Sequence, residues 1–372
     1  MKKIKILYIN TFDPYKENHG GATVTRKELE LISEIADVSV LFGSPLRTRF
    51  KRLDILKFLK DVLMGKSVKL ASYSVLNKDA SFYAPYDIIY CNHDMSAYDY
   101  QIFEQLKKPF IIRKLNAEYK FYSANKLFQK VERNRISLFE KEVGLSASSV
   151  IHLSSTEYAE DDYSKFKHLI FPPLLPTIHL SPNKSLENYN HSDRPIDLLC
   201  VTNYEWKPNM YGFDWFFANI APKLSPNINI HLVGKGSDRY KMNRGVTSHG
   251  FVKDVDSFYR RSKIFIAPVL TGAGIKIKNL EAMVNGIPII TTPLGIDGIG
   301  DVYETGGAYI ACSAEDFVNG IEILMSDEKK CCLQQIEAKK WILKNIPSEN
   351  KWKHDMFCLL KSVVGNESFA NR

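Results

Sequence analysis

The sequence predicts two α/β domains in tandem, each built on a parallel sheet with helices wound over both of its faces. Short apolar runs alternate with helical stretches from one end of the chain to the other, which is the pattern of strand–helix–strand crossovers in parallel sheets. The runs are nearly unbroken Val, Ile and Leu, as in strands that are covered on both faces. The alternation stops once, at the polar stretch "PTIHLSPNKSLENYNHSDRP", and then restarts.

This interruption divides the chain into four predicted parts. A length of 372 residues suits two domains of ordinary size better than one. We expect a Rossmann-like domain over residues 1–175, a linker over 176–195 and a second Rossmann-like domain over 196–345, facing each other across a cleft. Residues 346–372 are expected to form a C-terminal helix and tail that pack back toward the first domain.

In the first domain, the predicted strands are "IKILYIN", "VSVLFG", "YDIIYC", "FIIRKL", "SSVIHLS" and "HLIFPP". Helices are predicted near residues 22–35, 47–64, 95–107 and 119–143. In the second domain, the predicted strands are "IDLLCVTN", "INIHLVGKG", "VTSHGFV", "KIFIAPVL", "IPIITTP" and "AYIAC". From Asp327 onward the pattern is helical, and Trp341 and Trp352 are available for docking.

Composition indicates a cytoplasmic protein. The apolar part of "MKKIKILYIN" runs only from Ile4 to Ile9 and is broken by Lys5, so it is too short for a secretory core. No segment approaches the length that spans a bilayer. The six cysteines form no C-x-x-C pair or metal spacing, which favours reduced thiols.

The net charge of +8 is concentrated in one stretch, "LRTRFKRLDILKFLKDVLMGKSVK". Its basic residues and leucines predict an amphipathic helix over residues 47–69, suited to an anionic membrane surface on the inner face of the cell membrane. The alternative is a solvated helix that packs on its own sheet through Leu53, Leu56 and Leu63. Nucleic acid is not expected, because no second basic, aromatic patch appears.

Four loops of the second domain have the composition of an anion site. "TNYEWKPN", "GKGSDR", "HGFVKD" and "TGAGIKIKNLE" each follow a predicted strand. Glycines allow a close approach of backbone to ligand, and a helix N-terminus adds unpaired N–H groups and partial positive charge. With its lysines, "GAGIKIK" is therefore a candidate diphosphate cradle that needs no metal.

Lys278 and Glu281 are three residues apart and share a helix face. A lysine for phosphate beside a carboxylate for vicinal hydroxyls suits a nucleotide's diphosphate and ribose. The alternative is an ordinary surface ion pair beside a simple turn. A dinucleotide-dependent oxidoreductase is not favoured, because "GKGSDR" has Arg239 where the fingerprint needs a third glycine.

Several motifs together resemble a known family. "GAGIKIKNLEAMVNGIPIITTPLGIDGI" is similar to the signature of nucleotide-sugar glycosyltransferases of the two-domain GT-B type, in the retaining family 4. "NHGGATVTRKELELISEIADVSVLF" resembles that family's opening loop and first helix. "IIRKLNAEYKFYS" resembles its Arg-x-His-Asn-x-Glu-Tyr segment, and "LCVTNYEWKPNMYGFDWF", "IHLVGKG" and "SHGFVKDVDSFYRRSKIFIAPV" follow its C-terminal domain in order.

The resemblance implies a nucleoside-diphosphate sugar as donor, retention of anomeric configuration, and no metal or other cofactor. Glu281 would bind the ribose hydroxyls and Lys278 the diphosphate. The remaining donor contacts that it implies are Gly20, Gly21, Lys207, Gly234, Gly236, Phe251, Val252, Gly272, Ala273, Gly274, Ile275 and Lys276. Of these, Phe251 and Val252 would line the base pocket, while Lys207 and Lys276 are secondary phosphate candidates.

The chain departs from the family pattern at two positions. The residue eight before Glu281 is Ala273 instead of a second glutamate, a feature shared by members with a Gly-x-Gly-x-x-x-Lys loop. The histidine of the Arg-x-His-Asn segment is replaced by Leu115, and we consider His93 a candidate substitute in the catalytic site. Asn116 and Glu118 of the same segment are the implied contacts to the sugar or the acceptor.

Three functions therefore remain open. The first is a transferase that acts on a glycan or lipid-linked acceptor in bacterial surface polysaccharide synthesis. The second is a catalytically silent partner subunit with the same fold, which Leu115 favours. The third is a nucleotide-sugar epimerase on the same scaffold.

Overall fold

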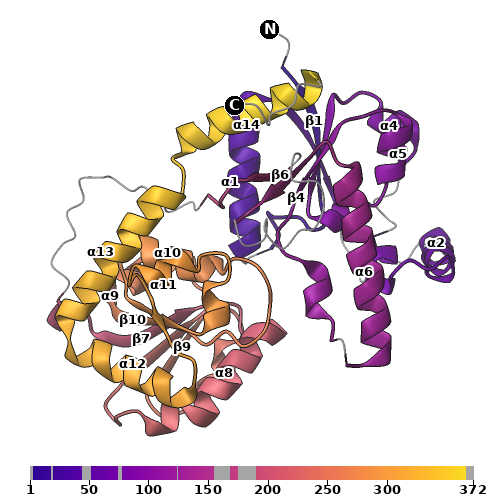
Figure 1. Ribbon diagram of the computed structural model, residues 1–372. Coiled ribbons are helices and arrows are strands. Elements are labelled where there is room, and N and C mark those ends of the chain that lie inside the picture. Colours follow the sequence, from indigo (N-terminus) through magenta and orange to yellow (C-terminus); the bar gives the residue numbers. More distant parts are fainter. Residues whose placement is uncertain are drawn as a thin grey trace. The chain divides into compact units, whose positions relative to one another are not determined.

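The computed structural model describes residues 3–17, 20–43, 52–73, 78–123, 125–154, 168–174 and 190–365. The chain divides into two compact units (Figure 1). Unit 1 comprises Met1–Leu174 together with Pro347–Arg372, and unit 2 comprises Leu175–Ile346. Most of the predicted linker, residues 176–189, lies outside the described residues.

Unit 1 is built on a six-stranded parallel sheet in the order β2-β1-β3-β4-β5-β6. The strands are β1 (Lys5–Asn10), β2 (Asp37–Phe42), β3 (Ile88–Asn92), β4 (Phe110–Arg113), β5 (Ser149–His152) and β6 (His168–Ile170). Strands β1, β3, β4 and β5 are buried along almost their whole length, as expected for a sheet that is covered on both faces.

The helical segments of unit 1 surround this sheet (Figure 1). They are α1 (Gly20–Ile35), α2 (Arg52–Leu63), α3 (Val68–Ala71), α4 (Ala80–Tyr83), η2 (Asp94–Ala97), α5 (Tyr100–Gln105), η3 (Glu118–Phe121), α6 (Leu127–Ser146) and α14 (Glu349–Gly365).

Two predicted helices of unit 1 are wrong in their extent. The helix predicted over 95–107 is interrupted at Asp99, whose backbone is not helical and whose side chain accepts hydrogen bonds from the Lys78 N–H (2.7 Å) and the Tyr83 hydroxyl (2.6 Å). The helix predicted over 119–143 begins only at Leu127, after the short η3 turn. Local polar contacts compete with the helix at such positions.

The last helix, α14, belongs to the core of unit 1 although it is the most distant element in the chain. Trp352 is buried with Met356 and Leu360 among side chains of α1, β1 and β3. Its ring meets that of Phe171 edge-on, with centroids 6.1 Å apart. Helices α1 and α14 lie side by side (Figure 1).

Unit 2 is built on a second six-stranded parallel sheet, in the order β12-β11-β10-β7-β8-β9. Its strands are β7 (Ile196–Val201), β8 (Ile230–Val233), β9 (Val246–Gly250), β10 (Ser262–Ala267), β11 (Ile289–Thr291) and β12 (Tyr309–Ile310). With the two sheets, the predicted doubly wound α/β fold is confirmed.

The helical segments of unit 2 are η5 (His191–Asp193), α8 (Lys207–Asn219), η6 (Ala221–Lys223), η7 (Ser237–Tyr240), α9 (Asp256–Arg261), α10 (Ile277–Val284), η8 (Pro293–Ile296), α11 (Asp301–Glu304), α12 (Ala314–Ser326) and α13 (Glu328–Asn345). Helix α13 is held to α11 by the Trp341 indole N–H, which donates to the Asp301 carboxylate at 2.7 Å. The two predicted docking tryptophans therefore pack in different units.

Candidate functional site

The four predicted loops of unit 2 meet at one edge of its sheet, because all the strands are parallel and their carboxyl ends lie together. Hydrogen bonds join the loops in pairs. The Gly234 N–H donates to the Gly250 carbonyl at 2.7 Å, and the Tyr204 N–H donates to the Lys235 carbonyl at 2.8 Å. Lys278 reaches the start of α8, where its Nζ donates to Asn209 Oδ1 at 3.1 Å.

The "GAGIKIK" loop forms an open turn that leads into helix α10. Gly272 and Gly274 have φ values of 119° and 73°, which favour glycine. The Gly274 N–H donates to Asp297 Oδ2 at 3.0 Å, and Lys276 bonds to the Gly274 carbonyl, with its Nζ 4.0 Å from the same Asp297 oxygen. No side chain caps α10. The first N–H groups of this helix are therefore available to an anionic ligand in front of its N-terminus.

Lys278 is a half-buried cation with a neutral partner, Asn209. Burial lowers the pKa of its ammonium group. Among the described residues, no carboxylate forms an ion pair with Lys278. The interpretation of Lys278 and Glu281 as an ordinary surface ion pair is therefore wrong, and a site with an uncompensated lysine favours an anionic ligand.

Glu281 lies one turn further along α10, also half-buried. Burial raises the pKa of its carboxyl to about 7. The nearby Tyr259 hydroxyl opposes this shift, although it does not meet the geometry of a regular hydrogen bond, and Asp256 adds to it. No cation pairs with this carboxyl among the described residues, and a carboxylate has acceptor capacity beyond its contact with Tyr259.

The other predicted donor contacts in unit 2 include two glycines that are required by packing, and further residues that are exposed or half-buried. Gly234 and Gly236 are required by packing within the protein, because a Cβ would lie 1.8 Å from the Thr202 carbonyl oxygen and 2.9 Å from Glu205 Cγ, respectively. Phe251 is 57% exposed at the same edge. Val252, Ala273 and Ile275 are half-buried and Lys207 is exposed.

In unit 1, His93 directly follows β3 with an unusual backbone φ of 99°. A positive φ in a residue other than glycine is strained and is found disproportionately at functional sites. Its Nδ1 accepts the Met95 N–H at 3.1 Å, which leaves Nε2 as the donor to Glu118 Oε2 at 3.3 Å. Both ring nitrogens of this buried histidine thus have protein partners.

Glu118 is itself buried and lies between His93 and Lys69. Burial alone would raise the pKa of its carboxyl, but His93 and Lys69 outweigh that effect and lower it to about 2. Asn116 is half-buried, and its Oδ1 has no hydrogen-bond partner among the described residues. Leu115 is half-buried beside it, and Gly20 and Gly21 open helix α1 of the same unit.

Sequence reasoning missed three residues that shape the unit 2 site: Asn209, Tyr259 and Asp297. Asn209 lies at the end of the quoted loop "TNYEWKPN", where Lys207 drew attention because of its charge. Asp297 lies in "GIDGIG", within the quoted signature, but only the fold brings it to Gly274. Tyr259 gave no signal in the sequence.

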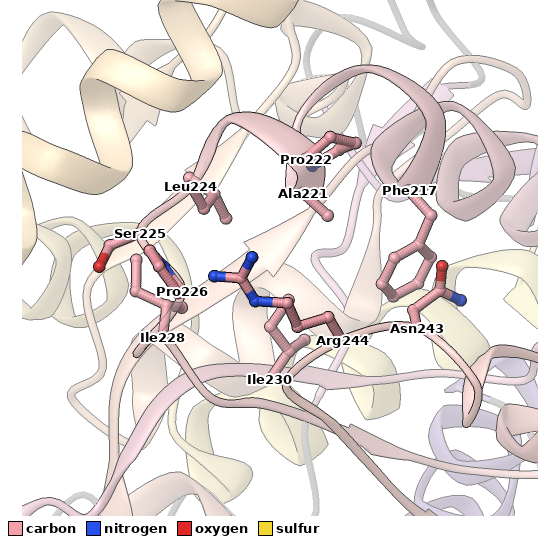
Figure 2. Close-up of a pocket in the computed structure, with 10 residues that line it drawn as sticks. All are labelled: Phe217, Ala221, Pro222, Leu224, Ser225, Pro226, Ile228, Ile230, Asn243 and Arg244. Carbon is pink, nitrogen blue, oxygen red and sulfur yellow. The ribbon is translucent and has the colours of Figure 1, made fainter.

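A separate cavity of about 230 Å³ lies at the opposite edge of the unit 2 sheet (Figure 2). Its lining includes Ile228 and Ile230 at the start of β8 and Arg244 before β9, whose side chain reaches into it in Figure 2. Because these are the amino ends of the strands, the cavity is distinct from the site of Lys278 and Glu281.

Residues 195–327, which make up most of unit 2, match the family model of the Glycosyl transferases group 1. The predicted resemblance to glycosyltransferases is confirmed. A protein of Klebsiella pneumoniae, described as an uncharacterized 44.6 kDa protein in the cps region, is 25% identical over 348 residues. That match covers 80% of this chain and 84% of the relative.

Solved glycosyltransferase structures share the fold of the whole chain. Sucrose-phosphate synthase from Thermosynechococcus elongatus matches with a TM-score of 0.70 and 13% identity, over 98% of this chain and 100% of that one. HepE of Anabaena in complex with UDP gives 0.65 and 13%, over 96% and 100%. WaaG, a glycosyltransferase involved in lipopolysaccharide biosynthesis, gives 0.66 and 12%, over 95% and 99%. The GT-B architecture predicted from the motifs is confirmed.

None of the helices that the structure describes has both the length and the apolar composition needed to cross a bilayer.

Proposed function

We propose that the protein is a glycosyltransferase that moves a sugar from a nucleoside-diphosphate donor, with retention of configuration and without a metal, to a glycan or lipid-linked acceptor in surface polysaccharide synthesis. The group 1 family match supports transfer of a sugar. The cps-region relative and the UDP complex of HepE support the pathway and the donor class. We place the reaction in the cytoplasm.

One observation carries the donor assignment. Lys278 and Glu281 project from the first turns of α10 without ion-pair partners among the described residues. Burial lowers the pKa of Lys278 and raises that of Glu281, which favours the neutral form of each. A diphosphate would restore the charge of Lys278, and ribose hydroxyls would donate to the Glu281 carboxylate. The uncapped N-terminus of α10 adds N–H groups for the phosphates, and the open turn at Gly272 allows them to approach closely.

We expect the residues around α10 to act by electrostatic stabilisation. In the mechanism that the resemblance implies, the departing phosphate oxygen takes the acceptor proton on the same face of the sugar. The protein then has to stabilise the charge on the leaving diphosphate and to position the acceptor. Lys278 and the start of α10 supply the stabilisation, while His93, Asn116 and Glu118 are the candidates for positioning in unit 1.

The test is calorimetric titration with UDP-, GDP-, ADP- and TDP-sugars, with and without EDTA, followed by transfer assays with the donor that binds. We expect one nucleotide sugar to bind regardless of EDTA. The Lys278→Ala variant should lose about 3 kcal/mol of transition-state stabilisation, roughly a hundredfold in rate. Lys329→Ala, which removes an exposed lysine of α13, is the matched control.

Unchanged turnover in Lys278→Ala would contradict the phosphate assignment. If no nucleotide sugar binds, the silent-partner alternative becomes the better hypothesis, because Leu115 already replaces the family's histidine.

A further inference from the structure

Several apolar side chains of helix α2 lie on the outside. Leu56, Leu59 and Leu63 lie on one face of the helix and are 62%, 48% and 87% exposed, and Met64 follows at 72%. Asp61, on the opposite face, is buried. A helix that only covers its own sheet has the reverse arrangement. The alternative in which Leu56 and Leu63 pack on the sheet is therefore wrong, and the side chain of Leu53 lies outside the described residues.

The start of helix α6 shows the same reversal. Leu127 and Phe128 are 82% and 67% exposed, and Val131 is 40% exposed. Glu132, in contrast, is 2% exposed and faces inward. Nothing in the sequence pattern of residues 119–143 drew attention to this end of the helix.

These two apolar faces belong to neighbouring elements. The Val68 N–H at the start of α3 donates to Glu132 Oε2 at 2.8 Å, and the Arg135 guanidinium donates to the Lys66 carbonyl at 3.4 Å. Helix α2 leads directly into α3, and α3 contacts α6. We call residues 56–69 and 126–135 together the α2–α6 surface.

The α2–α6 surface exposes cations but no carboxylate. Its only two acids, Asp61 and Glu132, are buried. Asp61 accepts a hydrogen bond from the Tyr98 hydroxyl and pairs with Lys66 at 3.2 Å, while Glu132 accepts the Val68 N–H. Among the basic side chains that the structure describes in this surface, Lys60, Lys126 and Lys130 are exposed.

We propose that the α2–α6 surface binds an anionic lipid bilayer, with Leu63, Leu127 and Phe128 at the level of the headgroups and the lysines on lipid phosphates. Large apolar side chains interspersed with cations are the composition of helices that lie in the membrane interface. A protein partner or a second copy of this chain would leave the lysines without counter-charges unless it brought its own. The sequence indicated only the part near α2, and α6 supplies a second point of contact that fixes the orientation of unit 1.

Membrane binding in this orientation would bring the bilayer to the candidate acceptor residues. Only this consequence rests on the proposed function; the membrane binding itself does not. Lys69, within the α2–α6 surface, pairs with Glu118, which in turn contacts His93. A bilayer bound to the surface would therefore lie beside the candidate acceptor residues. A lipid-linked acceptor would reach them without leaving the membrane.

The experiment is co-sedimentation of the full chain with vesicles of one part phosphatidylglycerol to two parts phosphatidylcholine, without donor or acceptor, so that its outcome does not depend on the proposed function. We expect binding that weakens with added salt and is lost on pure phosphatidylcholine. Lys126→Gln/Lys130→Gln should weaken binding about thirtyfold at low salt, and Leu127→Ser/Phe128→Ser about tenfold or more.

The matched controls are Lys329→Gln/Lys330→Gln and Leu333→Ser/Leu343→Ser on α13, which remove similarly exposed side chains in unit 2. They should bind vesicles as the parent chain does. The proposal is overturned if the α6 variants bind like these controls. It is also overturned if sedimentation equilibrium shows a dimer that the same leucine and phenylalanine changes dissociate, since the surface would then bind a second copy of the chain.

Discussion

At the scale of single residues, burial determines the ionisation of the side chains that we assign to the donor. Lys278 and Glu281 are both partly removed from water, and neither has an oppositely charged partner among the described residues. Each therefore favours its neutral form more than it would in solution. In the proposed complex, the diphosphate would supply the negative charge that Lys278 lacks, and the ribose would donate hydrogen bonds to Glu281.

If Glu281 binds the donor as proposed, donor binding depends on pH. Its pKa is raised from the ordinary value of 4.5 to about 7, so the carboxylate proposed to accept from the ribose hydroxyls forms only as the pH rises through that value. We expect the Kd for a nucleotide sugar to fall by up to about tenfold between about pH 6 and about pH 8, measured by calorimetry. A nucleotide sugar is used because its diphosphate does not titrate in this range.

The control for this prediction is Glu281→Gln, which keeps the size of the side chain and removes its charge. Its Kd should be weaker and nearly constant over the same range. A pH dependence that survives in Glu281→Gln would assign the titrating group elsewhere, for example to the His231 and His249 pair, whose ring nitrogens lie 3.0 Å apart.

At the scale of elements, helix α14 packs in unit 1 although it follows the whole of unit 2 in the sequence. It joins α1 through the ion pairs of Lys27 with Glu349 (2.8 Å) and of Lys353 with Glu34 (2.7 Å). The carboxylate of each pair is exposed, and ion pairs open to solvent in this way contribute little. The apolar side chains around Trp352 therefore provide most of the stabilisation.

Trp352→Ala should destabilise unit 1 by about 3–5 kcal/mol, because it removes a fully buried ring and leaves a cavity. Calorimetric unfolding is expected to show one transition shifted to lower temperature, while nucleotide-sugar binding at Lys278 in unit 2 is retained. Leu343→Ala, which truncates an exposed leucine of α13, serves as the control and should leave both transitions in place. Loss of donor binding in Trp352→Ala would show that the two units do not fold independently.

At the scale of the whole molecule, a buried acidic cluster links the stability of unit 1 to pH. Glu140 of α6 accepts the Glu118 N–H at 2.9 Å. Burial and the nearby Asp94 together raise the pKa of Glu140 to about 9, although Lys114 opposes the shift. The folded state thus holds a proton on Glu140 that the unfolded state releases above its ordinary pKa of 4.5.

Because the folded state binds more protons here, its stability contribution is complete below about pH 4.5 and is lost as the pH rises toward about 9. We expect the Tm of unit 1 to fall between about pH 6 and about pH 8.5, and to fall less in Glu140→Gln, whose amide oxygen still accepts the Glu118 N–H. Glu104→Gln, on the exposed face of α5, should behave as the parent chain. An unchanged slope in Glu140→Gln would place the pH dependence in other groups.

Much of the fold could be predicted from local patterns. Continuous Val, Ile and Leu runs indicate strands covered on both faces, and the single polar interruption separates two sets of them. Helix boundaries were less predictable, because Asp99 ends a helical pattern through bonds to Lys78 and Tyr83, which are distant in the sequence. Such contacts leave no periodic signal.

By itself, the sequence determined the strands, the division into two α/β parts, and the loop that carries Lys278 and Glu281, because all of these depend on neighbours along the chain. The tertiary structure decided which residues meet. It placed Asn209 on Lys278 and Asp297 on Gly274, paired His93 with Glu118, and turned the leucines of α2 and the start of α6 outward. The physical reason is that burial and partnership depend on segments far apart in the chain, and these quantities set the charge of a site and the exposure of a surface.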